Sequence, residues 1–283
     1  MNQNTQQPDH PTAHSTPETG ALPVAKPLNP DGEDEQRLSA IQRAWLAIPN
    51  WVFALIGIAI FLALFGDSID HMRRVGFAKS GWWHKTKDGE TIRLAWAYLL
   101  VLCTYVLIIL AFVFRRPPKS RACRASEIII PLIAAVWPLL PWIALRILDA
   151  TGHKQAAAFQ NFIIDKRITL NWFLAGGACV CIGNALDVWG YSYLFRSFSI
   201  VAEARELVVT GPYRIVRHPV YLGQIIAQAG IWICFAPFHI VWLCFFVFFA
   251  AMQLYRGQVE DEVLERAFGE RYRRWREKTY WFI

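Results

Sequence analysis

The chain has few charged residues for its length, and some long stretches have none. Asp, Glu, Lys and Arg make up 18% of its 283 residues, while 55% are hydrophobic and 14% aromatic. Leu94–Phe114 contains no charged residue, and the same holds for Ala44–Gly66, Ile128–Leu145 and Ile168–Leu186. This composition excludes an ordinary soluble domain. Each run is about as long as a helix needs to be to cross the ~30 Å hydrocarbon core of a bilayer, where helices satisfy their own backbone groups.

The longest run without Asp, Glu, Lys or Arg is Pro219–Tyr255, which has 37 residues. As a single helix it would measure ~55 Å, too long for one crossing. Pro237 lies in its middle, so we predict two short spans joined by a tight turn at Ala236–Pro237. The predicted fold is therefore an all-α integral membrane protein with about six transmembrane helices, including a short C-terminal helical hairpin.

Other signatures are missing as well. The six Cys show neither metal-ligand spacing nor the pattern of a disulfide framework, so we expect no metal. Gly176, Gly177 and Gly183 lie inside an apolar run, where close helix packing is a better explanation than a phosphate loop. Most Arg residues flank apolar runs, which indicates contact with the lipid bilayer and argues against nucleic acid as a partner.

Basic residues predict the orientation. Five Lys or Arg fall within residues 115–124, so this short loop is expected in the cytoplasm. Alternation then places both termini in the cytoplasm, either of a bacterial inner membrane or of the endoplasmic reticulum. Residues 1–36 carry six Pro, six acids and one Lys and have no apolar core, so they predict a disordered cytoplasmic tail instead of a signal peptide.

The polar connector before the hairpin is the most informative segment. Gly211–Pro212 is a turn signal, and Pro219 suits the first turn of the following helix. The free amides at that helix start could bind a carboxylate or the polar edge of a cofactor. Arg217 and His218 come just before it. The alternative is a simple membrane-boundary helix with interfacial Arg, His and Tyr.

A second informative segment follows the hairpin. Arg256 and Glu260 are four residues apart, so they share one face of a helix close to the membrane exit. The alternative is an ordinary surface salt bridge. The apolar spacing that continues from there predicts an amphipathic cytoplasmic helix, broken near Gly269. Its two stripes are Leu264, Phe268 and Tyr272, and Val259, Val263 and Ala267.

Together these segments resemble the isoprenylcysteine carboxyl methyltransferase family over roughly residues 195–283. The resemblance rests on an ordered set with a hairpin between its halves. The set is Leu207–Val208, Gly211-Pro212-Tyr213, Arg217-His218-Pro219, Tyr221, Gly223, Arg256, Glu260, Phe268-Gly269, Tyr272 and Phe282-Ile283.

The resemblance implies a membrane-embedded methyltransferase that uses S-adenosylmethionine. It places the core in residues 167–283 and leaves residues 37–166 as an N-terminal region of three transmembrane helices. It implies that Arg256 orients the substrate. The implied cofactor-binding residues are Arg205, Glu206, Leu207, Val208, Tyr213, His218, Pro219, Val220, Tyr221 and Glu260.

Two positions depart from the family pattern, because Asp261 replaces a second Glu and Arg205 replaces a His. The expected acceptor is lipidic or prenylated, with a prenylated carboxylate, a phospholipid headgroup and a small thiol left open. The alternatives are a sterol-reductase-like NADPH enzyme and a non-catalytic membrane adaptor. The reductases favour an acid after the glycine, where Gln224 stands here, and have more spans.

Overall fold

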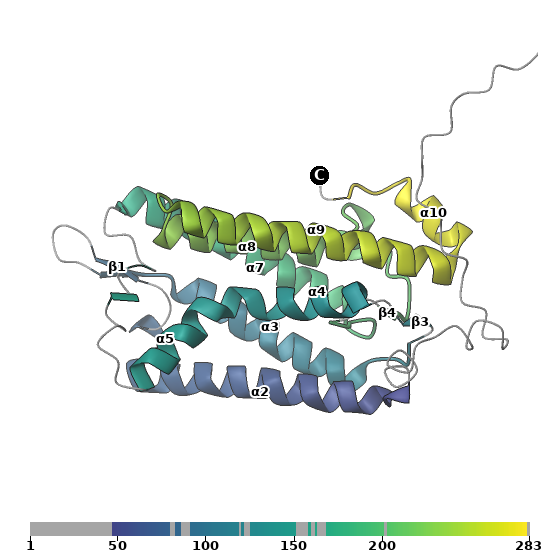
Figure 1. Ribbon diagram of the computed structural model, residues 1–283, viewed down its shortest axis with the longest axis horizontal. Coiled ribbons are helices and arrows are strands. Elements are labelled where there is room, and N and C mark those ends of the chain that lie inside the picture. Colours follow the sequence, from purple (N-terminus) through teal and green to yellow (C-terminus); the bar gives the residue numbers. More distant parts are fainter. Residues whose placement is uncertain are drawn as a thin grey trace, which may run out of the picture. The chain divides into compact units, whose positions relative to one another are not determined.

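A computed structural model describes residues 47–79, 83–85, 91–118, 120–121, 125–150, 158–159, 162, 168–200 and 203–281 (Figure 1). The predicted tail, residues 1–36, and the terminal Phe282-Ile283 lie outside these residues.

The described part of the chain is mostly helical, as the apolar runs predict. Its longer helices are α2 (Asn50–Val75), α3 (Ala95–Phe114), α4 (Ala125–Val136), α5 (Leu140–Ala150), α7 (Leu170–Leu194), α8 (Pro219–Phe235), α9 (Ile240–Phe268) and α10 (Glu270–Arg276). Short 3₁₀ turns are η2 (Phe77–Lys79), η3 (Trp137–Leu139) and η4 (Gly211–Arg214). Two small antiparallel pairs join β1 (Trp83–Lys85) to β2 (Thr91–Arg93), and β3 (Ser120–Arg121) to β4 (Glu203–Ala204).

The structure confirms an all-α architecture with helices that are long and apolar enough to cross a membrane. Among the described residues, four helices are long and apolar enough to cross a membrane, namely α2, α3, α7 and α9. Ile128–Leu139 and Pro219–Phe235 are shorter apolar helices. The number of spans, predicted as about six, therefore stays a prediction for these two segments, and so does the orientation of the termini.

The run Ile128–Leu145 is not one straight helix. Helix α4 ends at Val136, η3 covers Trp137–Leu139, and α5 then takes a different direction (Figure 1). Pro138 and Pro141 lie at this junction. Proline cannot donate the backbone hydrogen bond that a continuous helix requires, and its ring clashes with the preceding turn. Two prolines three residues apart therefore explain the break.

Helices α7 and α8 are packed against each other through glycine. A Cβ atom built on Gly183 would lie 2.4 Å from the backbone nitrogen of Ala227, and one on Gly223 would lie 2.7 Å from the carbonyl oxygen of Gly183. Two turns further along, Gly176 and Gly230 face each other with the same closeness. Small residues let membrane helices approach backbone to backbone. The packing role predicted for the glycines of this run is confirmed for Gly176 and Gly183.

The hairpin lies where it was predicted. Helix α8 ends at Phe235, α9 begins at Ile240, and the turn between them contains Ala236 and Pro237. The amphipathic segment is continuous with the second hairpin helix, so α9 is 29 residues long, or about 43 Å. It ends at Gly269, whose φ of +51° favours glycine.

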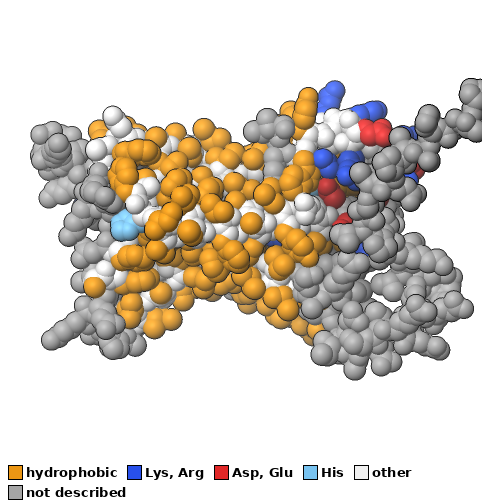
Figure 2. Space-filling model, turned by 45° about the horizontal axis from the view of Figure 1, so that its top comes forward, with side chains coloured by type: hydrophobic (Ala, Val, Ile, Leu, Met, Phe, Trp, Pro, Cys, Tyr) orange, Lys and Arg blue, Asp and Glu red, His pale blue; other side chains and the backbone are white. Residues whose placement is uncertain are grey.

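Polar and apolar side chains separate along the molecule. Hydrophobic side chains cover the middle of the face shown in Figure 2, and the Lys, Arg, Asp and Glu side chains gather at the end that carries α10. This is the distribution expected of a protein with an apolar belt in the bilayer and a charged end in water.

The connector between α7 and α8 is held at this charged end by the Arg-rich loop. Strand β3 from the loop pairs with β4 from the connector, with Ser120 opposite Ala204. The backbone nitrogen of Arg116 also donates to the carbonyl of Arg196 over 3.0 Å. Below the connector, Ala204 packs against Val259 and Val263 of α9, so one predicted apolar stripe faces the connector.

Candidate active site

A polar pocket opens between the end of α7, the connector, the start of α8 and the emerging part of α9. Six of the residues expected at the site line it: Tyr213, His218, Val220, Tyr221, Arg256 and Glu260. The remaining lining residues are Tyr191, Leu194, Ser197, Phe198, Ser199 and Glu203. Residues from three separate segments of sequence thus meet at one place, as the resemblance implied.

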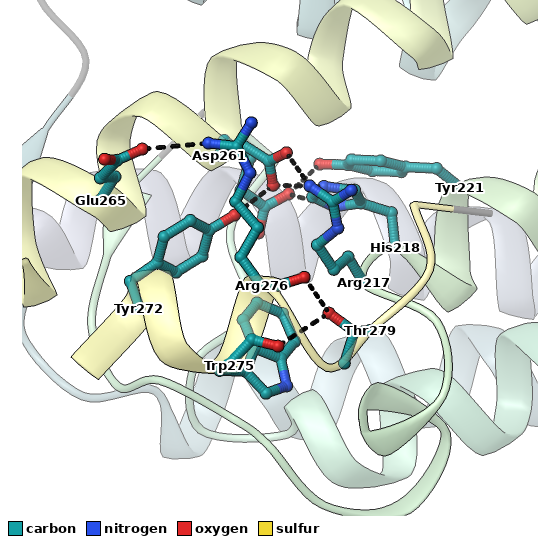
Figure 3. A network of polar contacts seen from close by, with 10 residues as sticks. Arg217, His218, Tyr221, Asp261, Glu265, Tyr272, Trp275, Arg276 and Thr279 are labelled. Atoms are coloured by element: carbon teal, nitrogen blue, oxygen red, sulfur yellow. Dashed lines mark hydrogen bonds and ion pairs between the residues drawn. The ribbon is translucent and has the colours of Figure 1, made fainter. Parts of the chain in front are cut away.

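Asp261 ties the walls of this pocket together (Figure 3). Its carboxylate accepts hydrogen bonds from Arg217 Nη1 at 2.9 Å and from His218 Nε2 at 2.7 Å. A third donor is the hydroxyl of Tyr272 on α10. Burial raises the pKa of Tyr272 above its ordinary value, and the Asp261 carboxylate adds to that shift, so the phenol keeps its proton and donates. A carboxylate only accepts, hence His218 carries its proton on Nε2.

Glu260, one residue earlier, points into the pocket. Its Oε2 accepts a hydrogen bond from the Tyr221 hydroxyl at 2.7 Å and lies 3.8 Å from His218 Nδ1. The His218 and Tyr221 rings are stacked, with centroids 5.5 Å apart. The two neighbouring carboxylates therefore differ in role. Glu260 faces the pocket, and Asp261 holds the connector by accepting hydrogen bonds from Arg217 and His218.

Arg256 is buried and belongs to a chain of polar contacts across three helices. Its Nη1 donates to Gln253 Oε1 at 2.9 Å, Gln253 donates to Gln224, and Gln224 Nε2 donates to the Tyr191 hydroxyl at 3.0 Å. Arg256 Nη2 donates to the Ile200 carbonyl at 3.2 Å. The guanidinium also lies over the Tyr221 ring, 4.7 Å from its centroid. Arg256 thus does not form an ion pair with Glu260 in the part of the chain that the structure describes.

The C-terminal segment closes the pocket from one side. Trp275 Nε1 donates to the Tyr213 carbonyl at 3.0 Å. Tyr280 pairs with the connector, since its nitrogen donates to the Ile215 carbonyl and its carbonyl accepts from the Arg217 nitrogen. The rings of Trp281 and His218 meet edge to face, with centroids 6.1 Å apart. The connector is therefore held by α9, by α10 and by the C-terminal residues Tyr280 and Trp281.

The remaining expected site residues lie outside the pocket lining. Arg205 is buried and donates to Glu203 and to Asn50 of α2, while Glu206 is half exposed and pairs with Arg116. Leu207 and Pro219 are buried, and Val208 is half-buried. Contact of these five residues with a cofactor stays a prediction.

Tyr213 is a buried aromatic wall of the pocket. Burial raises the pKa of its phenol well above the ordinary value, and the nearby Glu260 carboxylate raises it further. The group therefore stays neutral at physiological pH, and its ring and that of Tyr221 can face a cation without competing charge.

A second cavity adjoins the first and lies between the membrane helices. It encloses about 450 Å³ and is lined by residues of α2, α3, α4, α7, α8 and α9. Tyr191, Phe198 and Arg256 line both spaces, so the two meet at these side chains. Most of its wall is apolar, but Asn184, Asp187, Gln224 and Gln228 also line it.

Sequence reasoning missed this cavity and the α7 side of the pocket. Asp187 and Tyr191 were outside the expected span, which ended at Leu186, although α7 continues to Leu194. An acidic residue inside a membrane helix is a signal of function, and it could have been found by extending the span. Ser199 and Glu203 carried no such signal, because their place depends on the path of the connector.

Comparison with known proteins agrees with the site. Residues 172–271 match the sequence model of the phospholipid methyltransferase family, a membrane methyltransferase family related to the isoprenylcysteine carboxyl methyltransferases. No curated protein matches the chain at a significant level. The matched region includes every residue that lines the polar pocket. This part of the chain is thus similar to a membrane methyltransferase family, which supports methyl transfer over a reductase activity.

Proposed function

We propose that the protein transfers a methyl group from S-adenosylmethionine, bound in the polar pocket, to a lipidic acceptor that enters through the membrane cavity. The observation that carries the proposal is that the polar pocket and the membrane cavity share three lining residues, Tyr191, Phe198 and Arg256. A water-soluble donor and a lipid-soluble acceptor have to meet at such a boundary. The family match supplies the type of reaction.

The side chains of the polar pocket suit this cofactor. Glu260 and the hydroxyls of Ser197 and Ser199 offer acceptors for its ammonium and ribose hydroxyl groups. The rings of Tyr213 and Tyr221 offer faces for a cationic sulfonium. The cofactor supplies an electrophilic methyl group. The residues would bind and orient it, with Arg205, Glu206, Leu207, Val208, His218, Pro219 and Val220 as further proposed contacts.

The pocket is narrower than a cofactor of this size requires. It encloses about 40 Å³, whereas ligand sites usually enclose about 300–1,000 Å³. The connector forms one wall and lies outside the long helices, so it is the wall that can move outward, although this requires Phe198 to shift against Phe112 and Tyr191. We therefore expect cofactor binding to displace residues 195–200 while the α7–α8 contact stays unchanged.

Arg256 is the proposed substrate-orienting residue. It lies where the polar pocket and the membrane cavity meet, and its buried Nε has no hydrogen-bond partner among the residues that the structure describes. An anionic or carbonyl oxygen of the acceptor would satisfy that donor. Arg keeps its proton at every accessible pH, so it serves as an anchor and not as a base. Methyl transfer then depends on alignment and exclusion of water.

A cofactor-binding measurement tests the proposal that S-adenosylmethionine, the methyl donor, binds in the polar pocket. Glu260→Gln keeps the shape but removes the charge, and losing a hydrogen bond to a charged group costs about 1.5–3 kcal/mol. We expect calorimetry on the purified protein to show an S-adenosylmethionine affinity roughly tenfold to 150-fold lower. Glu265→Gln is the matched control, because Glu265 pairs with Arg273 and Arg276 away from the pocket. Equal affinity in the wild type and Glu260→Gln would remove Glu260 from the site.

Turnover in an Arg256→Lys variant distinguishes orientation of the acceptor from binding of the cofactor. Lysine keeps the charge but cannot replace both the contact to Gln253 and the one to Ile200. We expect turnover to fall sharply, with cofactor affinity near that of the wild type. A fully active lysine variant would contradict an orienting role for Arg256.

A further inference from the structure

Glu203 and Arg205 form a buried ion pair in the connector, beside the polar pocket. Extended backbone directs alternate side chains to opposite faces, so both lie on the face opposite the Ala204 side chain, which packs against α9. Arg205 Nη2 donates to Glu203 Oε2, and the two side chains are 0% and 6% exposed respectively. Glu203 lines the pocket, whereas Arg205 is buried outside its lining. The pocket therefore receives a carboxylate whose charge is already balanced.

Further contacts hold this ion pair in place. Arg205 Nη2 also donates to the side-chain oxygen of Asn50, at the start of α2, over 3.2 Å. The Ser199 hydroxyl donates to Glu203 Oε2 at 3.0 Å. The strand that carries Glu203 is paired with β3. Supporting hydrogen bonds of this kind restrict a side chain to one geometry, so Glu203 is a fixed acceptor in the wall that the connector forms.

The two carboxylates of the pocket differ in their charge balance. Glu260 accepts from the neutral Tyr221 hydroxyl at 2.7 Å, and no Lys or Arg of the described part of the chain forms an ion pair with it. It therefore suits a cation such as an ammonium group. A second cation beside Glu203 would be repelled by Arg205. A carboxylate can accept about four hydrogen bonds, so Glu203 can bind neutral hydroxyl groups in addition to its present donors.

We propose that Glu203 is a second cofactor-binding carboxylate, which accepts hydrogen bonds from the ribose hydroxyl groups of S-adenosylmethionine, and that Arg205 positions it. This inference rests on the proposed function. It gives the pocket two distinct ends, Glu260 for the ammonium group and Glu203 for the ribose. Arg205 then acts through Glu203 and not by direct contact with the cofactor. The role also gives a reason for Arg205 where the family pattern has His, since Arg keeps its charge at every accessible pH.

Two ligands that differ only in the ribose distinguish this role from a purely structural one. S-adenosylhomocysteine, the unreactive product, and its 2′,3′-dideoxy analogue are compared by calorimetry on the purified full chain. Losing a hydrogen bond to a charged group weakens binding roughly tenfold to 150-fold, so we expect the wild type to prefer the ribose ligand by a factor in this range. An ion pair that only joins the connector to α2 would affect both ligands alike.

A double variant, Glu203→Leu with Arg205→Met, tests the carboxylate itself. Replacing a buried ion pair by apolar side chains of similar volume is often neutral for stability, so this variant leaves no unpaired charge. We expect it to bind both ligands with equal affinity. Glu260→Gln should weaken both ligands and keep the preference for ribose, and Glu265→Gln, outside the pocket, should change neither affinity. An unchanged preference for ribose in the double variant would overturn the proposal.

Arg205→Met and Arg205→Lys test the positioning role. The first variant leaves Glu203 in the chain without its charged donor, and the second keeps a positive charge beside it. We expect the preference for the ribose ligand to be lost in Arg205→Met and largely kept in Arg205→Lys. Equal preference in Arg205→Met and the wild type would contradict positioning by Arg205. If Arg205→Met does not fold, the double variant still decides whether Glu203 contacts the ribose.

The wild type alone distinguishes a failed ribose contact from a failed proposed function. A wild type that binds S-adenosylhomocysteine and its dideoxy analogue equally would overturn the role of Glu203 and leave the proposed function standing. A wild type that binds neither of these ligands nor S-adenosylmethionine would refute the proposed function itself.

Discussion

Helices α7 and α2 are both long and apolar enough to cross a membrane, yet they differ in what surrounds them. In the most apolar 18-residue stretch of each helix, 44% of the α7 residues are buried in the protein, but only 6% of the α2 residues are. Helix α7 meets α8 through glycine backbones and carries Asp187 and Tyr191 into the two cavities. Helix α2 presents Trp51, Leu55 and Ile60 outward instead. The helices from α7 to α10 form a frame around the close-packed α7–α8 pair, and α2 forms an outer wall.

This difference assigns separate tasks to the two regions. The family match covers residues 172–271 and contains the whole lining of the polar pocket. Helices α2, α3 and α4 contribute only to the membrane cavity, through residues such as Phe61, Thr104 and Ala134. The frame would therefore set the chemistry, while the outer wall would set the shape of the lipid that fits.

The largest effect on stability is expected at Asp261, which holds the frame together at its polar end. Asp261→Asn removes the charge that Arg217 faces at 2.9 Å, and both side chains are largely buried. Breaking a buried pair costs about 3–5 kcal/mol, so we expect a loss of this size in the free energy of unfolding, measured by denaturant titration in micelles.

The matched control is the exposed ion pair between the Arg-rich loop and the connector. Arg116 and Glu206 are about half exposed, so Glu206→Gln should change stability by no more than about 1 kcal/mol. Equal losses in the two variants would mean that the half-exposed pair of Glu206 stabilises the protein as much as the buried pair of Asp261. That result would contradict the special role given to Asp261.

A smaller effect is expected from adding a methyl group between α7 and α8. Gly183→Ala places a Cβ atom 2.4 Å from the Ala227 backbone, and such overpacking costs about 1–3 kcal/mol. Gly66→Ala on α2 is the control, because no atom of the described residues lies within 4 Å of its Cβ position. There the better helix propensity of alanine makes the change neutral or slightly stabilising. A tolerated Gly183→Ala would contradict the close packing of the α7–α8 pair.

Much of the frame could be predicted from local signals. The turn at Ala236–Pro237, the helix end at Gly269 and the shared face of Arg256 and Glu260 each depend on neighbouring residues, through proline, glycine or helical spacing. The meeting of Tyr213, His218 and Glu260 was available only from the family resemblance, because no local rule brings a connector onto a distant helix.

The remaining features depend on long-range packing. Arg205 could not be assigned from the sequence, since its partner Asn50 lies 155 residues away on α2. The pairing of β3 with β4 likewise joins two polar segments without a strand pattern. The role of Asp261 as the acceptor of three donors follows only once α10 folds back onto α9.

Transfer of label from S-adenosylmethionine to extracted lipid tests the central claim most directly. Membranes that contain the protein are incubated with methyl-labelled cofactor, the lipids are extracted, and the labelled species are identified against membranes that contain Glu260→Gln. The account predicts label in an extractable lipid with the wild type, reduced at limiting cofactor in the variant. Purified protein that binds the cofactor and membranes whose lipids stay unlabelled would contradict a lipid acceptor, and with it the task assigned to the membrane cavity.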